Sequence, residues 1–307
     1  MGLAAPVAEL IVLEASYRAI RGDVAVLGRQ TTYVTEANLN WLLQKYGLPR
    51  VAGLEIEPDF ATAGAGEIAI RAHDGRKLEL ITDRTFFRAL GADSFSAIDV
   101  SAYEGADIIC DLSRSVPPEL YGRFDFIYDG SSLDNIFNPA EAMSNMSRML
   151  RPGGRLIIAE HGSLDTGAYT AFSPGWFFDF FAANGYRDCK IYVGGFIGPV
   201  NMLIGPWGLY VYNWHGEKNG FCPPIQGEPP TLVVIAIAEK GERSTDDVYP
   251  VQFQYRDRVY HDSVFAENVA AMTDSPRPLY GLPFGGRRPQ ECPDYLPCPQ
   301  LGGNAPF

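Results

Sequence analysis

The sequence lacks the cysteine pattern of a disulfide framework or a structural zinc site. It has five cysteines among 307 residues, an odd number, and none of them forms a Cys-x-x-Cys pair. Disulfide-rich secreted domains and zinc ribbons both depend on such pairs. We therefore predict no metal site and a reducing, cytoplasmic environment, with Cys110 and Cys189 as small buried residues of strand-like segments.

Basic clusters and long apolar runs are also missing. Lys and Arg number 25 against 37 Asp and Glu, which gives a formal net charge of -12. Nucleic acids and anionic membranes bind proteins through clustered positive charge, so we expect neither as a partner. The apolar N-terminal segment contains Glu9 and Glu14 and has no basic start, which argues against a membrane span and a signal peptide. Its apolar spacing instead predicts an amphipathic helix packed on a core.

What the sequence does contain is an alternation of β-rich and helical segments. Such alternation is typical of right-handed βαβ units and of a doubly wound, mainly parallel α/β sheet. Thr35, Asn138 and Ser173 are the predicted N-caps of three of the helices. Strands are predicted at residues 23–28, 94–100, 106–112, 123–130, 155–162, 186–195 and 231–241, and helices at 35–47, 82–91, 138–151 and 173–185.

The domain organisation follows from the same alternation. We predict one α/β domain over residues 1–240, with an insertion at about 48–92 that is rich in Gly and Ala and suits a small hairpin. From residue 241 to 307 the strand signals fade and Pro becomes frequent. The end of this C-terminal extension, residues 283–307, is predicted to be an extended arm rather than a packed domain.

In an open α/β sheet, ligands bind just beyond the carboxyl ends of the strands. The residues at the predicted strand ends therefore matter most for function. They are Gly28, Asp99, Asp111, the pair Asp129 and Gly130, and the pair Glu160 and His161.

The segment FDFIYDGSSLDNIFNPAEAMSNMSRMLRPGGRLIIAEHG (124–162) resembles the second half of the class I S-adenosylmethionine-dependent methyltransferases. The resemblance extends back through the strand ends AIDVS and CDLS and forward through the last two strands, so that it covers about Asp23 to Lys240. It implies a Rossmann-like sheet of seven strands, S-adenosylmethionine as the cofactor and methyl transfer as the activity.

The resemblance also implies a role for each acid. Asp99 is expected to accept hydrogen bonds from the ribose hydroxyls, which suits a carboxylate because it is purely an acceptor. Asp111 is expected near the adenine amino group, with Leu112 against the ring, and Asp129 beside the sulfonium and methionine portion. Each Asp also has a purely structural interpretation as a strand-end or turn residue, and for Asp129 this is an Asp-Gly turn with Gly130.

The loop after the first strand departs from the family pattern. Family members carry two or three glycines there, which let the backbone approach the cofactor. This chain has Gly28 followed by Arg29 and Gln30. Their side chains either narrow the pocket or bind the cofactor themselves, Gln30 through its amide and Arg29 by pairing with the methionine carboxylate. Two interpretations of this loop remain open: it still binds the cofactor, or it is a structural relic that no longer does.

Acid–base chemistry has one candidate near the expected crevice. Related sequences often show Glu-His where this chain has Asp134 and Asn135, so His161 is the remaining imidazole and the predicted catalytic base. Two alternatives stay open: a locally hydrogen-bonded His161, and a transfer that needs alignment only.

The stretch between the last two predicted strands is rich in aromatic residues. Together with Trp176, the stretch has two interpretations: a roof over the acceptor pocket, or a hydrophobic cluster or oligomer contact. Its aromatic residues include Phe196, Trp207, Tyr210, Tyr212, Trp214 and Phe221.

We therefore predict an S-adenosylmethionine-dependent methyltransferase for a small-molecule or sugar-derived acceptor. The alternative is a catalytically inactive methyltransferase-fold protein that serves as a binding or assembly module. Homo-oligomerisation through the aromatic loop or the C-terminal tail is compatible with both. A nicotinamide-dependent reductase is a weaker third interpretation, because the first loop lacks the full GxGxxG fingerprint.

Overall fold

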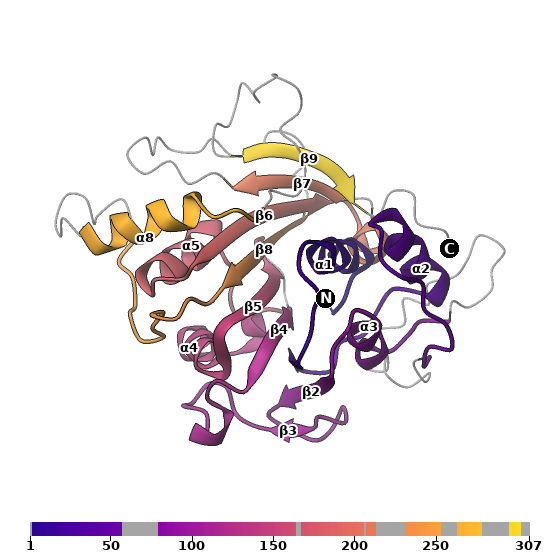
Figure 1. The fold of residues 1–307 in the computed structure, drawn as a ribbon, viewed down its shortest axis with the longest axis horizontal. Helices are drawn as coiled ribbons and strands as arrows, with labels where there is room; N and C mark the ends of the chain where they lie inside the picture. Colours follow the sequence, from indigo (N-terminus) through magenta and orange to yellow (C-terminus); the bar gives the residue numbers. More distant parts are fainter. Residues whose placement is uncertain are drawn as a thin grey trace.

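A single mixed sheet forms the centre of the protein (Figure 1). The structure is a computed structural model that describes residues 2–56, 79–163, 167–205, 207–212, 231–252, 263–277 and 295–301. Within these residues nine strands pair in the order β3-β2-β1-β4-β5-β8-β6-β7-β9. They are β1 (Asp23–Leu27), β2 (Ser94–Asp99), β3 (Ile108–Ile109), β4 (Phe124–Gly130), β5 (Leu150–His161), β6 (Asp188–Phe196), β7 (Trp207–Tyr212), β8 (Thr231–Glu239) and β9 (Tyr295–Leu301).

The first seven strands in this order are those predicted from the sequence. β3, β2, β1, β4 and β5 run parallel, and β8 lies antiparallel between β5 and β6. Because the chain proceeds from β1 to β2 on one side and to β4 on the other, the strand order reverses at β1. This reversal is where an open α/β sheet binds its ligand. β7 and β9 extend the sheet beyond β6.

Helices cover both faces of the sheet (Figure 1). Two buried clusters result, because alternate residues of a strand point to opposite faces. In β1, Val24 and Val26 belong to one cluster, and Ala25 and Leu27 belong to the other. One face carries α1 (Ala5–Tyr17), α2 (Glu36–Lys45) and α3 (Asp83–Ala89), the other carries α4 (Pro139–Met149), α5 (Pro174–Ala183) and α8 (Ser263–Thr273), and the short α6 (Pro199–Ile204) follows β6.

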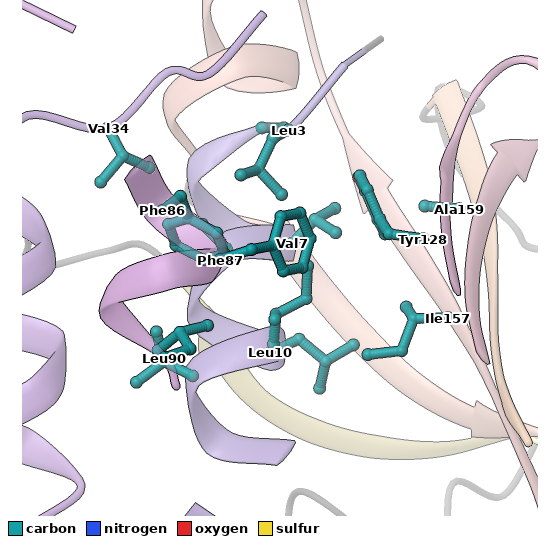
Figure 2. Packing of buried hydrophobic residues seen from close by; sticks show 14 of the residues in the cluster. Leu3, Val7, Leu10, Val34, Phe86, Phe87, Leu90, Tyr128, Ile157 and Ala159 are labelled. Carbon is teal, nitrogen blue, oxygen red and sulfur yellow. The ribbon is translucent and has the colours of Figure 1, made fainter. Parts of the chain in front are cut away.

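The N-terminal helix α1 is buried on nearly all sides, unlike the amphipathic helix that its spacing predicts. Val7 and Leu10 lie between α3 and the sheet residues of β4 and β5 (Figure 2). Its two glutamates are fully buried and paired. Glu9 accepts hydrogen bonds from Lys45 at 2.5 Å and from Tyr46 at 2.7 Å. The pairing explains how acids are tolerated in this core, since a buried charge needs a partner.

Part of the C-terminal extension packs on the domain, and the prediction of an extended arm is wrong for the segment that forms β9. α8 packs on α5 and β6. β9 pairs antiparallel with β7 and completes that edge of the sheet. The predicted hairpin of the insertion falls mainly at 57–78, outside the described residues. No helix in the described ranges has both the length and the apolar character needed to cross a membrane.

Candidate active site

A crevice opens at the carboxyl ends of the parallel strands, beside the point where the strand order reverses. Its volume is about 690 Å³. Small-molecule sites span roughly 300–1,000 Å³, so the crevice has room for a ligand of that class. Its walls come from the N-terminal segment, the ends of β1 to β4, the loops after β4 and β5, and α6.

Gly28 begins the loop after β1 and lines the crevice. Its backbone has a φ of 66°, a left-handed conformation that costs little only for glycine. Its N–H donates to the Ile98 carbonyl at 2.7 Å, which fixes the loop to β2. The one glycine that the loop retains is therefore required by the backbone conformation at its first position.

Asp83, at the start of α3, holds the rest of this loop. It is fully buried and accepts hydrogen bonds from Arg29 at 2.8 Å and 3.1 Å and from the Gln30 N–H at 2.8 Å. A carboxylate from the inserted segment thus fixes a loop that has few glycines. The predicted pairing of Arg29 with a cofactor carboxylate stays a prediction, and Asp83 already balances the charge of this guanidinium.

Gln30 lies in the wall of the crevice but does not fill it. Its side-chain nitrogen donates to the Leu27 carbonyl at 2.6 Å. Its Oε1 is buried and has no hydrogen-bond partner among the described residues. An unsatisfied buried acceptor costs about 1–3 kcal/mol. Oε1 lies against Gly130, because a Cβ added at Gly130 would come within 2.3 Å of it.

Three acids and an apolar side chain line the β2 and β3 side of the crevice. Asp99 ends β2 and accepts a hydrogen bond from the Ser101 N–H at 3.0 Å. Asp111 follows β3, and its hydrogen bonds from Ser113 lower the pKa of its carboxyl. The structure thus brings Asp99, Asp111 and Leu112 to one crevice, whereas their individual roles stay predictions.

The third acid, Glu104, was missed in the sequence because it follows β2 by several residues. It lines the crevice on the same side as Asp99. Burial and the neighbouring charge of Asp99 raise the pKa of the Glu104 carboxyl, and Arg29 partly opposes this shift. Its presence makes this side of the crevice more negative than the strand ends alone indicate.

Asp129, which the resemblance places beside the sulfonium, is a buried acid. It is fully buried and is not among the residues that line the crevice. It lies behind the wall near Glu160, and burial raises the pKa of Asp129 to about 6. Burial and the charges of Asp129 and Asp134 raise the pKa of Glu160 well above its usual range. The place beside the sulfonium that the resemblance implies for Asp129 stays a prediction.

The residues after Asp129 form this wall instead. Gly130 is the last residue of β4, so the predicted Asp-Gly turn is absent there and the chain turns at Ser131, which has a φ of 70°. Gly130, Ser131 and Ser132 all line the crevice. A left-handed conformation in a non-glycine residue is uncommon and tends to occur at functional sites.

Among the described residues, His161 is linked to the crevice through Ser131. It is buried, it is absent from the crevice lining, and its Nδ1 lies 3.1 Å from the Ser131 hydroxyl. The same nitrogen contacts the carboxylate of buried Asp134. Burial acts to raise the pKa of Asp134, but hydrogen bonds from His161 and Ser131 outweigh it and lower the pKa overall. The chain therefore has an Asp–His pair that its linear sequence does not show.

The aromatic residues predicted to roof the acceptor pocket belong to the core where they are described. Phe196 and Trp207 are buried and stack with ring centroids 5.1 Å apart. Trp176 packs on Phe172 with ring centroids 4.8 Å apart. The hydrophobic-cluster interpretation holds for these residues. Trp214 and Phe221 lie outside the described residues, and the side chains of Tyr210 and Tyr212 are not described.

Three further residues that the sequence did not single out as site residues line the crevice. Phe137 and Tyr169 line it from the loops after β4 and β5, and both are exposed. Each follows a predicted strand end, and this position was the sequence signal that could have identified it as a crevice residue. Its exposure, however, depends on the conformation of the loop. Cys110 also lines the crevice and is half-buried, whereas Cys189 is buried as predicted.

A family model described as "Methyltransferase domain" matches residues 74–158. The matched segment is similar to a methyltransferase domain, and the parallel strands β3-β2-β1-β4-β5 have a Rossmann-like order. The matched segment includes Asp99, Asp111 and Leu112, and the loop that starts at Gly28 lies outside it. No curated protein matches the sequence.

Solved methyltransferase structures show only weak overall similarity to this domain. A 1,6-didemethyltoxoflavin-N1-methyltransferase of Burkholderia thailandensis is 14% identical, with a TM-score of 0.37, and the alignment covers 76% of this chain and 77% of that one. A possible histamine N-methyltransferase of Thermotoga maritima is 15% identical, with a TM-score of 0.34 and coverage of 77% and 90%. Similarities of this size support no inference about the substrate.

Proposed function

We propose that the protein is an S-adenosylmethionine-dependent methyltransferase that acts on a small-molecule acceptor. The supporting observation is that Gly28, Asp99 and Asp111, from three different strand ends, line a single crevice of about 690 Å³. A methyltransferase domain fits this arrangement, because its cofactor needs acceptors for ribose and adenine at the ends of neighbouring strands.

The charge of the crevice fits this cofactor. Asp99, Glu104 and Asp111 line it, and its cation Arg29 is paired with Asp83. S-adenosylmethionine carries a sulfonium and an ammonium against one carboxylate, so it is favoured by a negative site. The pyrophosphate of a nicotinamide dinucleotide would be repelled, which argues against the reductase interpretation.

Each crevice residue has a role in this proposal. Asp99 accepts hydrogen bonds from the ribose hydroxyls. Asp111 lies at the adenine amino group, and Leu112 contacts the adenine ring. Gln30 stands in the crevice wall beside the methionine portion. The cofactor, when bound, supplies a methyl group on a sulfonium sulfur.

The acceptor must lose a proton as it is methylated, and the protein offers one route for that proton. The Ser131 hydroxyl lines the crevice and lies 3.1 Å from Nδ1 of His161. Asp134 accepts a hydrogen bond from the Ser131 hydroxyl at 2.7 Å and contacts the same nitrogen of His161. In this proposal Ser131 takes the acceptor's proton while its own proton passes to the Asp134–His161 pair, which holds it. A small acceptor, including a sugar-derived one, fits a crevice of this size.

The alternative is a binding or assembly module that has lost catalysis. The observation that favours it is the loop itself, because Arg29 is held by Asp83 and Gln30 and Tyr33 both stand in the crevice wall. This alternative predicts no binding of the cofactor or its product.

Isothermal titration calorimetry with S-adenosylhomocysteine tests the proposal. We expect micromolar binding to the wild-type protein and a loss of at least about tenfold in Asp99→Ala, which corresponds to about 1.4 kcal/mol. Asp247→Ala is the matched control, because Asp247 is exposed and outside the crevice. Circular dichroism checks that both variants fold. Absence of binding heat and of a thermal shift in the wild type would support the module.

A further inference from the structure

Two exposed aromatic side chains stand together at the rim of the crevice. Phe137 is 87% exposed and Tyr169 is 73% exposed, and both line the crevice. Their ring centroids are 5.9 Å apart with an interplanar angle of 85°, an edge-to-face contact. Large aromatic side chains exposed together at a concave site mark a surface that binds a ligand.

The backbone of Asp134 fixes both loops. The N–H groups of Tyr169 and Thr170 donate to the Asp134 carbonyl at 2.8 Å and 3.2 Å. The N–H of Asp134 donates to buried Glu160 at 3.1 Å, and Phe137 follows Asp134 by three residues. The aromatic pair is therefore exposed but anchored to the end of the sheet. A site held in place before binding loses less conformational entropy on binding.

The aromatic pair lies on the opposite side of the crevice from the cofactor acids. Asp99 and Asp111 follow β2 and β3, whereas Phe137 and Tyr169 follow β4 and β5. In the sheet β2 and β3 lie to one side of β1, and β4 and β5 lie to the other. One crevice thus has an acidic end and an aromatic end, which suits two different ligands.

The chemistry of the walls indicates what the aromatic end binds. Aromatic faces stack with planar rings and attract cations. Asp99, Glu104 and Asp111 give the crevice a negative potential, and Arg29 is paired with Asp83. An anionic acceptor such as a carboxylate or a phosphorylated sugar is disfavoured, and a cationic ring is favoured.

We propose that the acceptor is a planar aromatic molecule with a protonated amine, held by Phe137 and Tyr169. This inference rests on the proposed methyltransferase function, whose acceptor class it specifies. The amine here is a recognition group, and the atom that is methylated is not assigned.

Three probe molecules separate the elements of this proposal when added to the protein saturated with S-adenosylhomocysteine. Tryptamine has a planar ring and a positive charge, 2-cyclohexylethylamine keeps the charge without the aromatic ring, and indole-3-acetate keeps the ring with a negative charge. We expect tryptamine to bind at least about tenfold more tightly than the other two, measured by calorimetry or ligand-observed NMR.

The variant Phe137→Ala/Tyr169→Ala tests whether the pair is responsible. We expect it to weaken tryptamine binding by about tenfold while the affinity for S-adenosylhomocysteine stays within about twofold. Tyr121→Ala is the matched control, because Tyr121 is an exposed tyrosine that does not line the crevice. Both changes are at exposed positions, where folding tolerates truncation.

Several results would overturn the inference. Equal binding of indole-3-acetate or 2-cyclohexylethylamine would exclude the proposed charge or the proposed ring, and no binding of tryptamine would exclude the acceptor class. A loss of S-adenosylhomocysteine affinity in the double variant would assign the pair to the cofactor. Failure of the wild type to bind S-adenosylhomocysteine would instead defeat the proposed function, and tryptamine binding would still be measurable on its own.

Discussion

Gln30 occupies a position where family members carry a glycine, and its side chain still leaves the crevice open. Its amide nitrogen is held by the Leu27 carbonyl, so the side chain lies toward Gly130. A Cβ added at Gly130 would come within 2.3 Å of Gln30 Oε1 and 2.8 Å of the Gly2 carbonyl. The space for the larger loop residue is therefore provided by a glycine at the end of a different strand.

Asp129 gives a pH-dependent prediction at the scale of a single residue. Burial raises its pKa to about 6, compared with about 4 in an unfolded chain. Between these values the folded protein binds more protons, so this carboxyl lowers the free energy of unfolding as the pH rises from about 4 to about 6. Asparagine cannot ionise, so Asp129→Asn should lose this contribution and gain stability relative to the wild type above pH 6.

Urea unfolding at several pH values across this window measures the effect. The expected result is a wild-type-minus-variant difference in unfolding free energy that falls as the pH rises. The amide introduced by Asp129→Asn can still donate to Glu160, which preserves the contact behind the crevice wall. For Asp247→Asn, at an exposed position, the curve of unfolding free energy against pH should run parallel to that of the wild type. Parallel curves for Asp129→Asn as well would show that Asp129 titrates as an ordinary carboxyl.

Helix ends show how far local sequence signals reach at the scale of elements. Thr35 was predicted to cap α2, and it forms a capping box, in which its hydroxyl accepts from the Asn38 N–H at 3.1 Å. Asn138 caps α4 as predicted, with Pro139 in the first turn. Ser173 stands at the cap position of α5, but its side chain makes no capping hydrogen bond. Residue type therefore predicts the position of a cap, and the local backbone decides whether its bond forms.

Thr35→Ala and Ser173→Ala form a matched pair of variants. Removing the Thr35 hydroxyl should lower the free energy of unfolding by about 1 kcal/mol, because one N–H at the start of α2 loses its partner. Ser173→Ala should cost only a few tenths of a kcal/mol, because no capping bond is lost. Urea denaturation of both variants at neutral pH compares them directly. Equal losses would contradict the difference seen between the two caps.

Helix α1 shows what the apolar periodicity of a sequence cannot predict about the burial of a helix. Its apolar spacing predicted one buried face, yet Glu9 and Glu14 are both fully buried. Their partners, Lys45 and Arg155 among them, come from distant segments. A pattern confined to one helix cannot reveal that elements packed around it supply counter-charges.

Arg277 connects distant parts of the molecule. It follows α8 in the C-terminal extension, is only 4% exposed, and contacts Glu14 of α1 and Asp188 of β6. A third contact, at 3.3 Å, joins it to Glu239 of β8. One guanidinium thus ties the extension to the first helix and to two central strands. The sequence suggested no role for this residue.

Replacing Arg277 by methionine should destabilise the whole protein. Removing one partner of a buried ion pair typically costs about 3–5 kcal/mol, and we expect about 3 because Glu14 keeps Arg155 and Asp188 keeps Lys190. The measurement is urea denaturation at neutral pH, with Arg243→Met at an exposed position as the control. Similar small losses in both variants would show that the buried pairs contribute little.

The type and order of the main elements, and the strand ends that line the crevice, could be predicted from the amino-acid sequence. These features depend on local patterns, namely apolar runs, turn residues and acids directly after strands. Three features required the folded structure: Asp129 lies behind the crevice wall, Asp134 contacts His161, and Phe137 contacts Tyr169. Such outcomes depend on which way each side chain points where a strand ends and on which distant loops come together, and neither is encoded in a local pattern.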